Sequence, residues 1–221
     1  MNSLQLLIIE LILCQFFQIF LYKYYKTAGL YTFLIICVIL TSLMSLKTIT
    51  LFNYDINLGI IPFISIFTSA NILIQKNGHE SSKSLILTMS TVFLISYTLI
   101  YLVQIMDPSN INLFANASYD NIFIDSLRMY FSIFVTLLYS LLLNSKLYYY
   151  LKKMKNNILI SNIFSTIIIQ FLASILFGLI TYTFVKDPID ILKIIMIRYL
   201  ISLSVGILGT LPIYITKKVT E

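Results

Sequence analysis

Apolar runs of about 20 residues, separated by short polar segments, cover almost the whole chain. A helix needs about 20 apolar residues to cross the hydrocarbon core of a membrane. The pattern therefore predicts an all-α polytopic membrane protein, a single transmembrane domain over residues 1–221 with about seven transmembrane helices. Six is the alternative count if the first or third span does not cross fully. The predicted spans cover residues 3–21, 29–46, 58–74, 85–105, 122–143, 158–184 and 191–215.

The composition agrees with this division. Of the 221 residues, 59% are hydrophobic and 11% are charged, with a mean hydropathy of +0.92, whereas an average soluble domain is about 25% charged. The first run lacks a basic segment before it and a small-residue cleavage site after it, so we expect a retained span and not a cleaved signal.

The net charge of +6 is a topology signal, because the basic residues lie in short loops between apolar runs. When the loops are assigned alternately to two sides, one side carries Lys23, Lys26, Lys76, Lys83, Lys146, Lys152, Lys153, Lys155, Lys217 and Lys218. The other side carries Lys47 and Lys186 with the acids Asp55, Asp107, Asp120, Asp187 and Asp190. The positive-inside rule then predicts an N-terminus outside and a C-terminus in the cytoplasm. Nucleic-acid binding is not expected.

The third span, within the stretch Asn57 to Lys83, has the first candidate site. Its helix is predicted to begin near Pro62, and Thr68, Asn71 and Gln75 would share one face at spacings of three and four residues. Carboxamides in so apolar a segment cost free energy unless they are hydrogen-bonded. The partner could be another helix or a ligand.

The sixth span carries a second polar face. Asn162, Thr166, Gln170 and Ser174 follow one another at intervals of four residues, which places them on one side of a helix. Hydrogen bonding between membrane helices is the alternative role, above all for Thr166 and Ser174. Together with Asn71 and Gln75, this face could bound a cavity for a small polar molecule.

Ionisable residues inside the spans are further candidates. Glu10 lies within the first span, and an intramembrane carboxylate is a candidate for proton or ion coupling. A position near the interface is its alternative. For Arg128, Lys193 and Arg198, which lie toward span ends, snorkelling or a local ion pair is the simple interpretation.

No enzymatic or metal chemistry is expected from the remaining residues. His79 is the single histidine, and Cys14 and Cys37 stand in apolar runs without a paired ligand spacing, so a zinc site is not predicted. The sequence has no P-loop, zinc-protease helix or nucleophile elbow. We expect a protein without a cofactor that is not an enzyme.

The order of several segments resembles the queuosine-precursor transporter family, also called the vitamin uptake transporter family. The segments are LYKYYKTAGLYTF, LKTITLFNYDINLGIIPF, FTSANILIQKNG, Arg128 in the fifth span, NIFSTIIIQFLASILF and LGTLPIY. The resemblance implies a bacterial inner-membrane importer of 7-deazaguanines such as preQ0, preQ1 or queuine. It also implies substrate binding by the third, fifth and sixth spans. The residues so implicated are Asn71, Gln75, Arg128, Asn162, Thr166, Gln170 and Ser174.

This chain departs from the family pattern in one direction, and we interpret it as a divergent member. Neutral Asn71 and Gln75 stand where the family hallmark has Asp and Glu. Ser161, Ala173 and Ser202 stand where charged residues are common. Loss of several charged residues together is physically coherent, because a buried ion pair must lose both partners or neither. An altered specificity or a weaker binding of the ligand is the resulting hypothesis.

Three functions follow as alternatives. The first is an importer of a deazaguanine-like base. Its expected partners are a small-molecule substrate and membrane lipid. Whether it forms a homo-oligomer or binds another membrane protein is left open. The second is the substrate-binding subunit of an energy-coupling-factor vitamin transporter, which would need an ATPase module. The third is a membrane scaffold that transports nothing.

Overall fold

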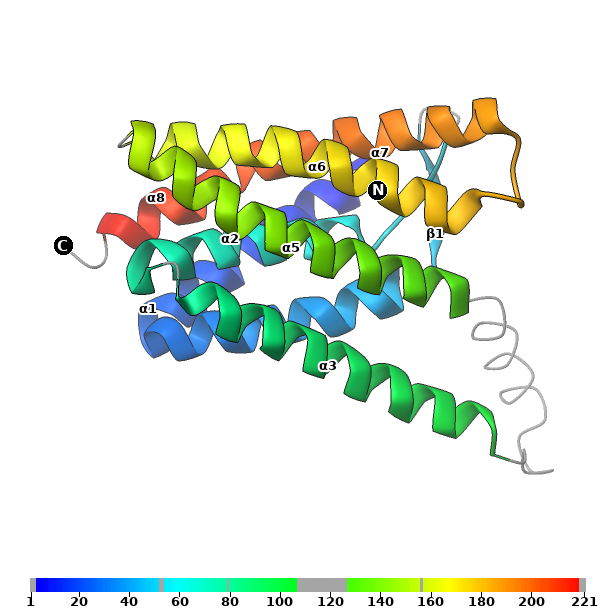
Figure 1. Ribbon diagram of the computed structural model, residues 1–221, viewed down its shortest axis with the longest axis horizontal. Helices are drawn as coiled ribbons and strands as arrows, with labels where there is room; N and C mark the ends of the chain where they lie inside the picture. The colour runs from blue at the N-terminus through cyan, green and yellow to red at the C-terminus, as the bar shows by residue number, and fades with distance from the viewer. Residues whose placement is uncertain (1–2, 52–53, 79, 107–126, 156, 219–221) are drawn as a thin grey trace.

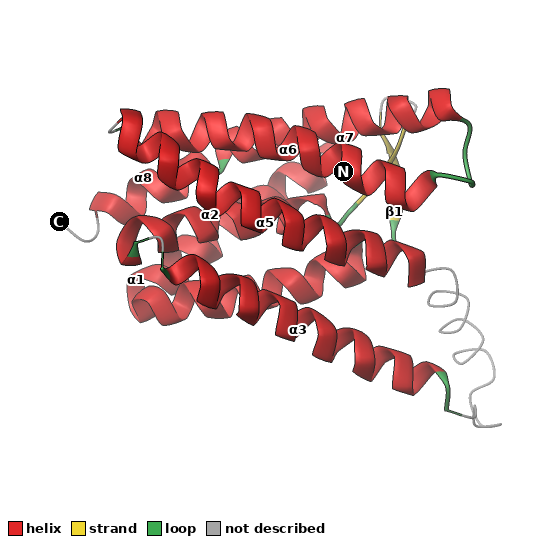
Figure 2. Ribbon diagram, in the orientation of Figure 1, coloured by secondary structure: helices red, strands yellow, loops and turns green. Residues whose placement is uncertain are grey.

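The computed structural model describes residues 3–51, 54–78, 80–106, 127–155 and 157–218. Within them the chain folds as a helical bundle with one short β-hairpin (Figures 1 and 2). The elements are α1 (Ser3–Met44), β1 (Thr48–Leu51), β2 (Tyr54–Asn57), α2 (Ile60–Asn77), α3 (Ser81–Gln104), α5 (Leu127–Lys155), α6 (Ile158–Tyr182), α7 (Pro188–Leu208) and α8 (Thr210–Lys218).

Helix α1 contains two arms joined by a sharp reversal. Its 42 residues would be about 63 Å long as a straight helix, about twice the hydrocarbon thickness of a membrane. Lys26 breaks the helix with φ 51° and ψ −129°, and the two arms fold back on each other in Figure 1. Three residues later, a Cβ on Gly29 would lie 2.1 Å from the carbonyl oxygen of Leu21. Glycine at position 29 is therefore needed for the two arms to approach each other. The reversal also agrees with the prediction of two separate spans in this part of the chain.

Helix α2 is the centre of the bundle. Residues 60–74 are all buried, and α2 contacts α1, α3, α5, α7 and α8. At 18 residues it is short. Pro62 lies in its first turn, where the N–H that proline lacks would have no partner within the helix. The segment that carries the first candidate site is thus surrounded by protein.

The segment between α1 and α2, expected to be a turn, is an antiparallel hairpin. Thr48 pairs with Asn57 and Leu51 with Tyr54. The backbone N–H of Leu58 also donates to the carbonyl of Lys47 at 3.0 Å. Strand β2 contacts α7, so the hairpin covers that end of the bundle.

Two boundaries differ from the predictions. Helix α5 continues to Lys155, through the segment predicted as a basic loop, because its lysines and tyrosines are compatible with a helix that leaves the membrane. The last predicted span is divided at Gly209 into α7 and α8. The predicted outer loop 109–121, Asp107, Asp120, His79 and the start of the fifth span lie outside the described residues.

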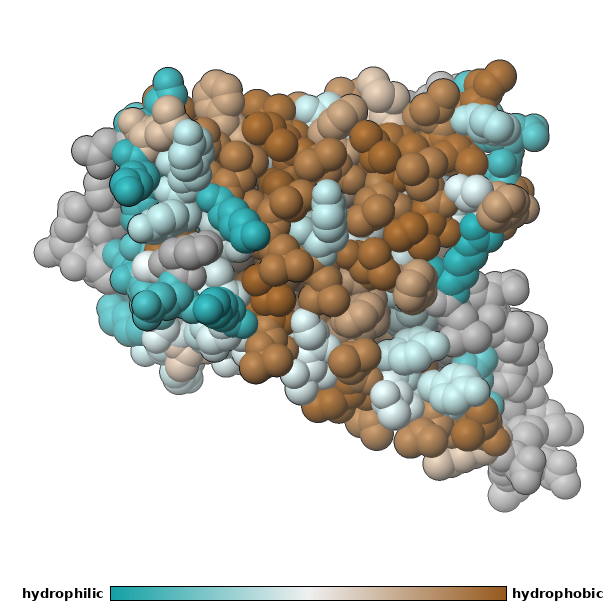
Figure 3. All heavy atoms as spheres, in the orientation of Figure 1, coloured by the Kyte–Doolittle hydropathy of each residue, from teal (hydrophilic) through white to brown (hydrophobic). Residues whose placement is uncertain are grey.

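The loops lie at the two ends of the bundle in the alternating order expected from the sequence (Figure 1). The reversal of α1, the α2–α3 and α5–α6 connections and the C-terminal helix lie at one end, here called the basic end. The hairpin and the α6–α7 connection lie at the other, here called the hairpin end. In Figure 3 a broad apolar band separates hydrophilic residues at the two ends.

Five helical segments in the described part of the chain are long and apolar enough to cross a membrane, counting α1 once and α7 with α8 as one. Large apolar side chains such as Leu87, Leu99 and Phe164 are more than half exposed. Such a surface is stable against lipid and not against water.

Candidate functional site

Three asparagines meet at the contact of α2, α5 and α6. The Asn144 amide nitrogen donates to Asn71 Oδ1 at 2.7 Å, and Asn71 Nδ2 donates to Asn162 Oδ1 at 2.7 Å. Each of the three side chains is at most 1% exposed. These residues, here called the amide cluster, join the two polar faces that the sequence singles out.

Asn144 was missed by the sequence analysis, although the same signal was present. Polar residues occur every fourth position along α5, and all are buried: Ser132, Thr136, Ser140, Asn144 and Tyr148. This stripe follows the same four-residue spacing as the one recognised on α6. Helices α5 and α6 pack along much of their length, and Asn144 and Asn162 bring one level of each stripe to the contact with α2.

Several polar atoms along these stripes are buried without a hydrogen-bond partner in the described part of the chain. They are Asn162 Nδ2, Gln170 Oε1, Ser174 Oγ, Thr136 Oγ1, Ser140 Oγ and the Tyr148 hydroxyl oxygen. A buried polar group without a partner costs about 1–3 kcal/mol. The interior is therefore polar beyond what helix packing requires, and its free donors and acceptors can bind water or a ligand.

Gln75 and Thr166 lie near the amide cluster but have different contacts. Gln75 is one turn closer to the basic end, with a buried and unpaired Oε1 among the described residues, and its main-chain carbonyl accepts from Lys152 Nζ at 3.3 Å. Thr166 packs against α7, where a Cβ on Gly206 would lie 2.3 Å from its methyl group. Thr166 thus holds α6 close to α7.

The polar residues of α2 bond to three neighbouring helices. Gln18 on α1 donates to Thr68 Oγ1 at 3.2 Å and to Ser69 Oγ at 2.8 Å, whereas Asn71 bonds to α5 and α6. Thr68 therefore does not act together with Asn71, as the shared helix face suggested. The sequence analysis did not single out Gln18, which lies among the apolar residues of the first span.

Arg128 lies far from the amide cluster. Its Nε donates to the carbonyl of Ile180 at 2.9 Å, and its guanidinium also donates to the carbonyl of Thr183. These carbonyls end α6 and have no partner within the helix. Ile180 is 18 residues from Asn162, about 27 Å along a helix. In this structure Arg128 caps α6 at the hairpin end and is not brought together with the other predicted site residues.

Glu10 is half-buried on the first arm of α1, and its Oε1 is buried without a hydrogen-bond partner among the described residues. Gln18, two turns further along the same arm, is the residue that bonds to α2. The structure thus places Glu10 in the bundle wall and not in the amide cluster.

The snorkelling predicted for Arg198 is wrong. Its side chain is 9% exposed and its guanidinium carbon lies 3.7 Å from the centroid of the Phe177 ring. Lys193, one helical turn earlier and on the surface, forms the expected local ion pair with Asp190 at 3.0 Å. The difference arises because Arg198 faces α6 and α2, which the position in the sequence does not reveal.

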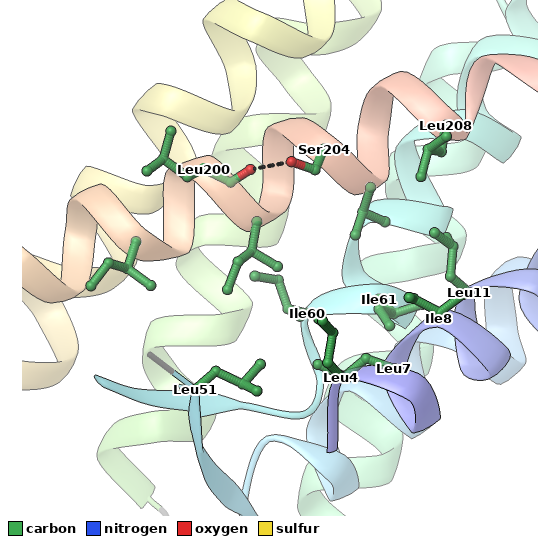
Figure 4. A pocket seen from close by; sticks show the side chains of 13 residues that line it. Leu4, Leu7, Ile8, Leu11, Leu51, Ile60, Ile61, Leu200, Ser204 and Leu208 are labelled. Atoms are coloured by element: carbon green, nitrogen blue, oxygen red, sulfur yellow. Dashed lines mark hydrogen bonds between the residues drawn. The ribbon is translucent and has the colours of Figure 1, made fainter. Parts of the chain in front are cut away.

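A large cavity of about 480 Å³ opens between the first arm of α1, the start of α2, β1 and α7 (Figure 4). Leucine and isoleucine side chains line it, and the single polar side chain in its wall, Ser204, already donates to the carbonyl of Leu200 at 2.9 Å. A polar ligand would find in this wall one side-chain acceptor, the Ser204 oxygen, and no free side-chain donor. The cavity suits an apolar chain such as that of a lipid.

Comparison with known proteins gives one result that bears on this site. A family model described as "Putative vitamin uptake transporter" matches residues 57–216, which include α2, α5, α6 and α7. The chain belongs to this family. Neither the curated proteins nor the solved structures contain a significant match. Membership of a transporter family, with several helices able to span a membrane, makes this a membrane transport protein and fits a protein that is not an enzyme.

Proposed function

We propose that this vitamin uptake transporter imports a small planar base, with a 7-deazaguanine such as preQ0, preQ1 or queuine as its substrate. The bacterial inner membrane is its proposed location, with the basic end toward the cytoplasm. The observation that carries the proposal is the amide cluster, in which Asn71 is bonded on both sides by carboxamides from α5 and α6.

The chemistry of a carboxamide supports a base as ligand. A carboxamide offers an acceptor oxygen beside a donor nitrogen, and the edge of a guanine-like ring presents the complementary pair of an N–H and a carbonyl. When a base enters, bonds between amides are exchanged for bonds between amide and base. Such an exchange leaves few buried groups unpaired in either state.

The unpaired polar atoms support a path through the interface. Gln170 lies eight residues from Asn162 on α6, about 12 Å toward the hairpin end. Ser174 lies one turn further. A base that binds first to Gln170 and then to the amide cluster would move along the α5–α6 interface toward the basic end. Alternating exposure of these two levels is the proposed transport mechanism, and Glu10 is a proposed coupling group.

The neutral residues Asn71 and Gln75 support a change of specificity relative to a site with carboxylates. A carboxylate accepts two hydrogen bonds, whereas a carboxamide accepts at one end and donates at the other. We therefore propose that the ring edge recognised here has both a donor and an acceptor.

Uptake of labelled preQ0, preQ1 and queuine in a host that lacks its own salvage transporter tests the substrate. Accumulation of at least one base above the empty-vector level is expected. Accumulation of none of the three would refute the substrate assignment. Leucine at Gln170 should abolish uptake while membrane insertion stays intact, and normal uptake by that variant would refute the path.

Purification separates the importer from the two alternatives left open by the sequence. A subunit of an energy-coupling-factor transporter would co-purify with an ATPase module and would need it for uptake. A scaffold would show no thermal stabilisation by any of the three bases.

A further inference from the structure

Arg198 is a largely buried charge that lies against the rings of Phe177 and Phe63 and has no acidic partner among the described residues. It lies on α7 near the hairpin end, its side chain is 9% exposed, and no hydrogen bond or ion pair joins it to another described residue. A buried charge without a compensating group is costly. This cost would be offset if the Arg198 guanidinium bound a ligand.

The surroundings of Arg198 fix its orientation. Its guanidinium lies 3.7 Å from the ring centroid of Phe177 on α6 and 5.6 Å from that of Phe63 on α2. Stacking on aromatic faces holds the plane of the guanidinium but does not use its N–H groups, which point outward from the edge. The group is therefore held in place with its donors unused.

A small pocket leads to these donors from the hairpin end. Asp55, Ile56 and Asn57 of β2 and Ile194 and Arg198 of α7 line it. Its volume of about 10 Å³ is roughly the space of one water molecule. Tyr182 O–H donates to Asn57 Oδ1 at 3.2 Å, and this is the hydrogen bond that ties β2 to α6. The pocket as it stands admits nothing larger, so binding of a planar ligand at Arg198 would require β2 to move away from α7.

The two charges in the pocket wall differ in strength. Asp55 is exposed, and its Oδ1 accepts from the Thr50 hydroxyl at 3.0 Å. A charge exposed to water acts through a high dielectric constant, whereas Arg198 is surrounded by aromatic rings and acts through a lower one. Arg198 therefore decides which ligand is preferred.

We propose that Arg198 anchors a second ligand site, at the hairpin end, which takes a planar molecule bearing a carboxylate or carbonyl oxygen. The guanidinium edge donates to that oxygen, and Phe177 holds the guanidinium from behind. The site is separate from the amide cluster, since Phe177 lies 15 residues from Asn162, about 22 Å along α6. It is the first contact of an incoming molecule and does not depend on the deazaguanine assignment.

Three aryl probes of the same size test the site: benzoate, benzamide and benzylammonium. The full chain in lipid nanodiscs is heated with each probe over the same millimolar range, and the dissociation constant is obtained from the shift of the unfolding midpoint. Benzoate should bind most tightly and benzamide next, and benzylammonium should bind at least tenfold more weakly than benzoate. Equal binding of the anion and the cation, or no binding of any probe, overturns the proposal.

Variants on α7 assign the effect to Arg198. Arg198→Gln should remove the preference for benzoate, whereas Lys193→Gln, which removes the same charge from the surface of the same helix, should keep it. If Arg198→Gln does not fold, Arg198→Lys replaces it. Arg198→Lys keeps the charge without the planar fork, so benzoate should bind at least threefold more weakly than to the wild type. An Arg198 variant that folds and binds benzoate as the wild type does refutes the anchor.

The probes also separate this site from the proposed function. Absence of deazaguanine uptake together with a benzoate preference that depends on Arg198 would refute the substrate and leave the second site standing. Deazaguanine uptake without a benzoate preference that depends on Arg198 would refute the second site and leave the substrate assignment standing.

Discussion

Helices α2 and α3 are neighbours in the chain and differ most in their surroundings. Residues 60–74 of α2 are all buried, whereas in the 24-residue α3 the buried residues are Ser82, Leu85, Met89 and Phe93. Figure 1 shows α3 at the edge of the bundle. Both are rich in isoleucine and leucine, so hydrophobicity does not distinguish them. The position of the carboxamides does: Asn71 and Gln75 stand within α2, whereas Gln104 is the last residue of α3. An amide that faces lipid has no partner, and an amide inside a bundle can find one.

The contrast also appears in the hydrogen bonds of the two helices. The buried helix α2 bonds through Gln18 to α1 and through Asn71 to α5 and α6. Thr88 and Ser90 of α3 donate to their own helix, to the carbonyls of Ser84 at 2.8 Å and Ile86 at 2.6 Å. Changes in α2 should therefore affect transport and folding, and changes in α3 should affect neither strongly.

The largest effect is expected from Asn71→Leu. It leaves the amides of Asn144 and Asn162 without their shared partner, and each unpaired group costs about 1–3 kcal/mol. Uptake should fall at least tenfold, while the protein still inserts. The matched control is Asn77→Leu, at the exposed end of the same helix, which should keep uptake. Uptake unchanged by Asn71→Leu would argue against the amide cluster as the site.

A pair of leucine truncations compares the two helices directly. Leu73 on α2 is fully buried and Leu99 on α3 is 58% exposed. Leu73→Ala leaves a cavity and should lower the free energy of unfolding by about 2 kcal/mol or more. Lipid can fill the space left by Leu99→Ala, so its cost should stay below about 0.5 kcal/mol. Chemical or thermal unfolding in the same detergent measures both, and equal costs would contradict the placement of α2 in the interior.

A smaller effect is expected from Gln18→Met, which keeps the size of the side chain and removes its two bonds to α2. Interhelical hydrogen bonds in membranes contribute about 0.6 kcal/mol each on average. The free energy of unfolding should fall by about 1 kcal/mol. When Gln18→Met is made in the Ser69→Ala variant, the further loss should be smaller, because one of the two bonds is already absent. Full additivity of the two changes would show that Gln18 and Ser69 do not interact.

The smallest effect is expected from Ser90→Ala on α3. The serine hydroxyl bonds within its own helix, and the backbone carbonyl keeps its helical partner when the hydroxyl is removed. Stability should change by less than about 0.5 kcal/mol and uptake should not change. A marked loss of uptake would mean that α3 takes part in transport.

The sequence by itself determined most of the architecture. The apolar runs predicted the helices, because a membrane requires each segment to satisfy its own backbone. The alternation of lysine-rich and acidic loops predicted which connections lie together, and Figure 1 has them at the two expected ends. The spacing of polar residues on α2 and α6 also predicted two polar stripes that face each other, and the hydrogen bond from Asn71 to Asn162 joins them at one level.

The tertiary structure alone decided which face of each helix meets which neighbour. Asn144 joins the amide cluster because α5 packs against α6 with its polar stripe inward, a rotation that sequence spacing does not define. The two arginines show the same limit. Arg128 caps α6 and Arg198 is buried against Phe177, although the sequence suggested snorkelling or a local ion pair for both. Depth in the membrane follows from position along the chain, but a side chain's partners follow from packing between helices far apart in the sequence.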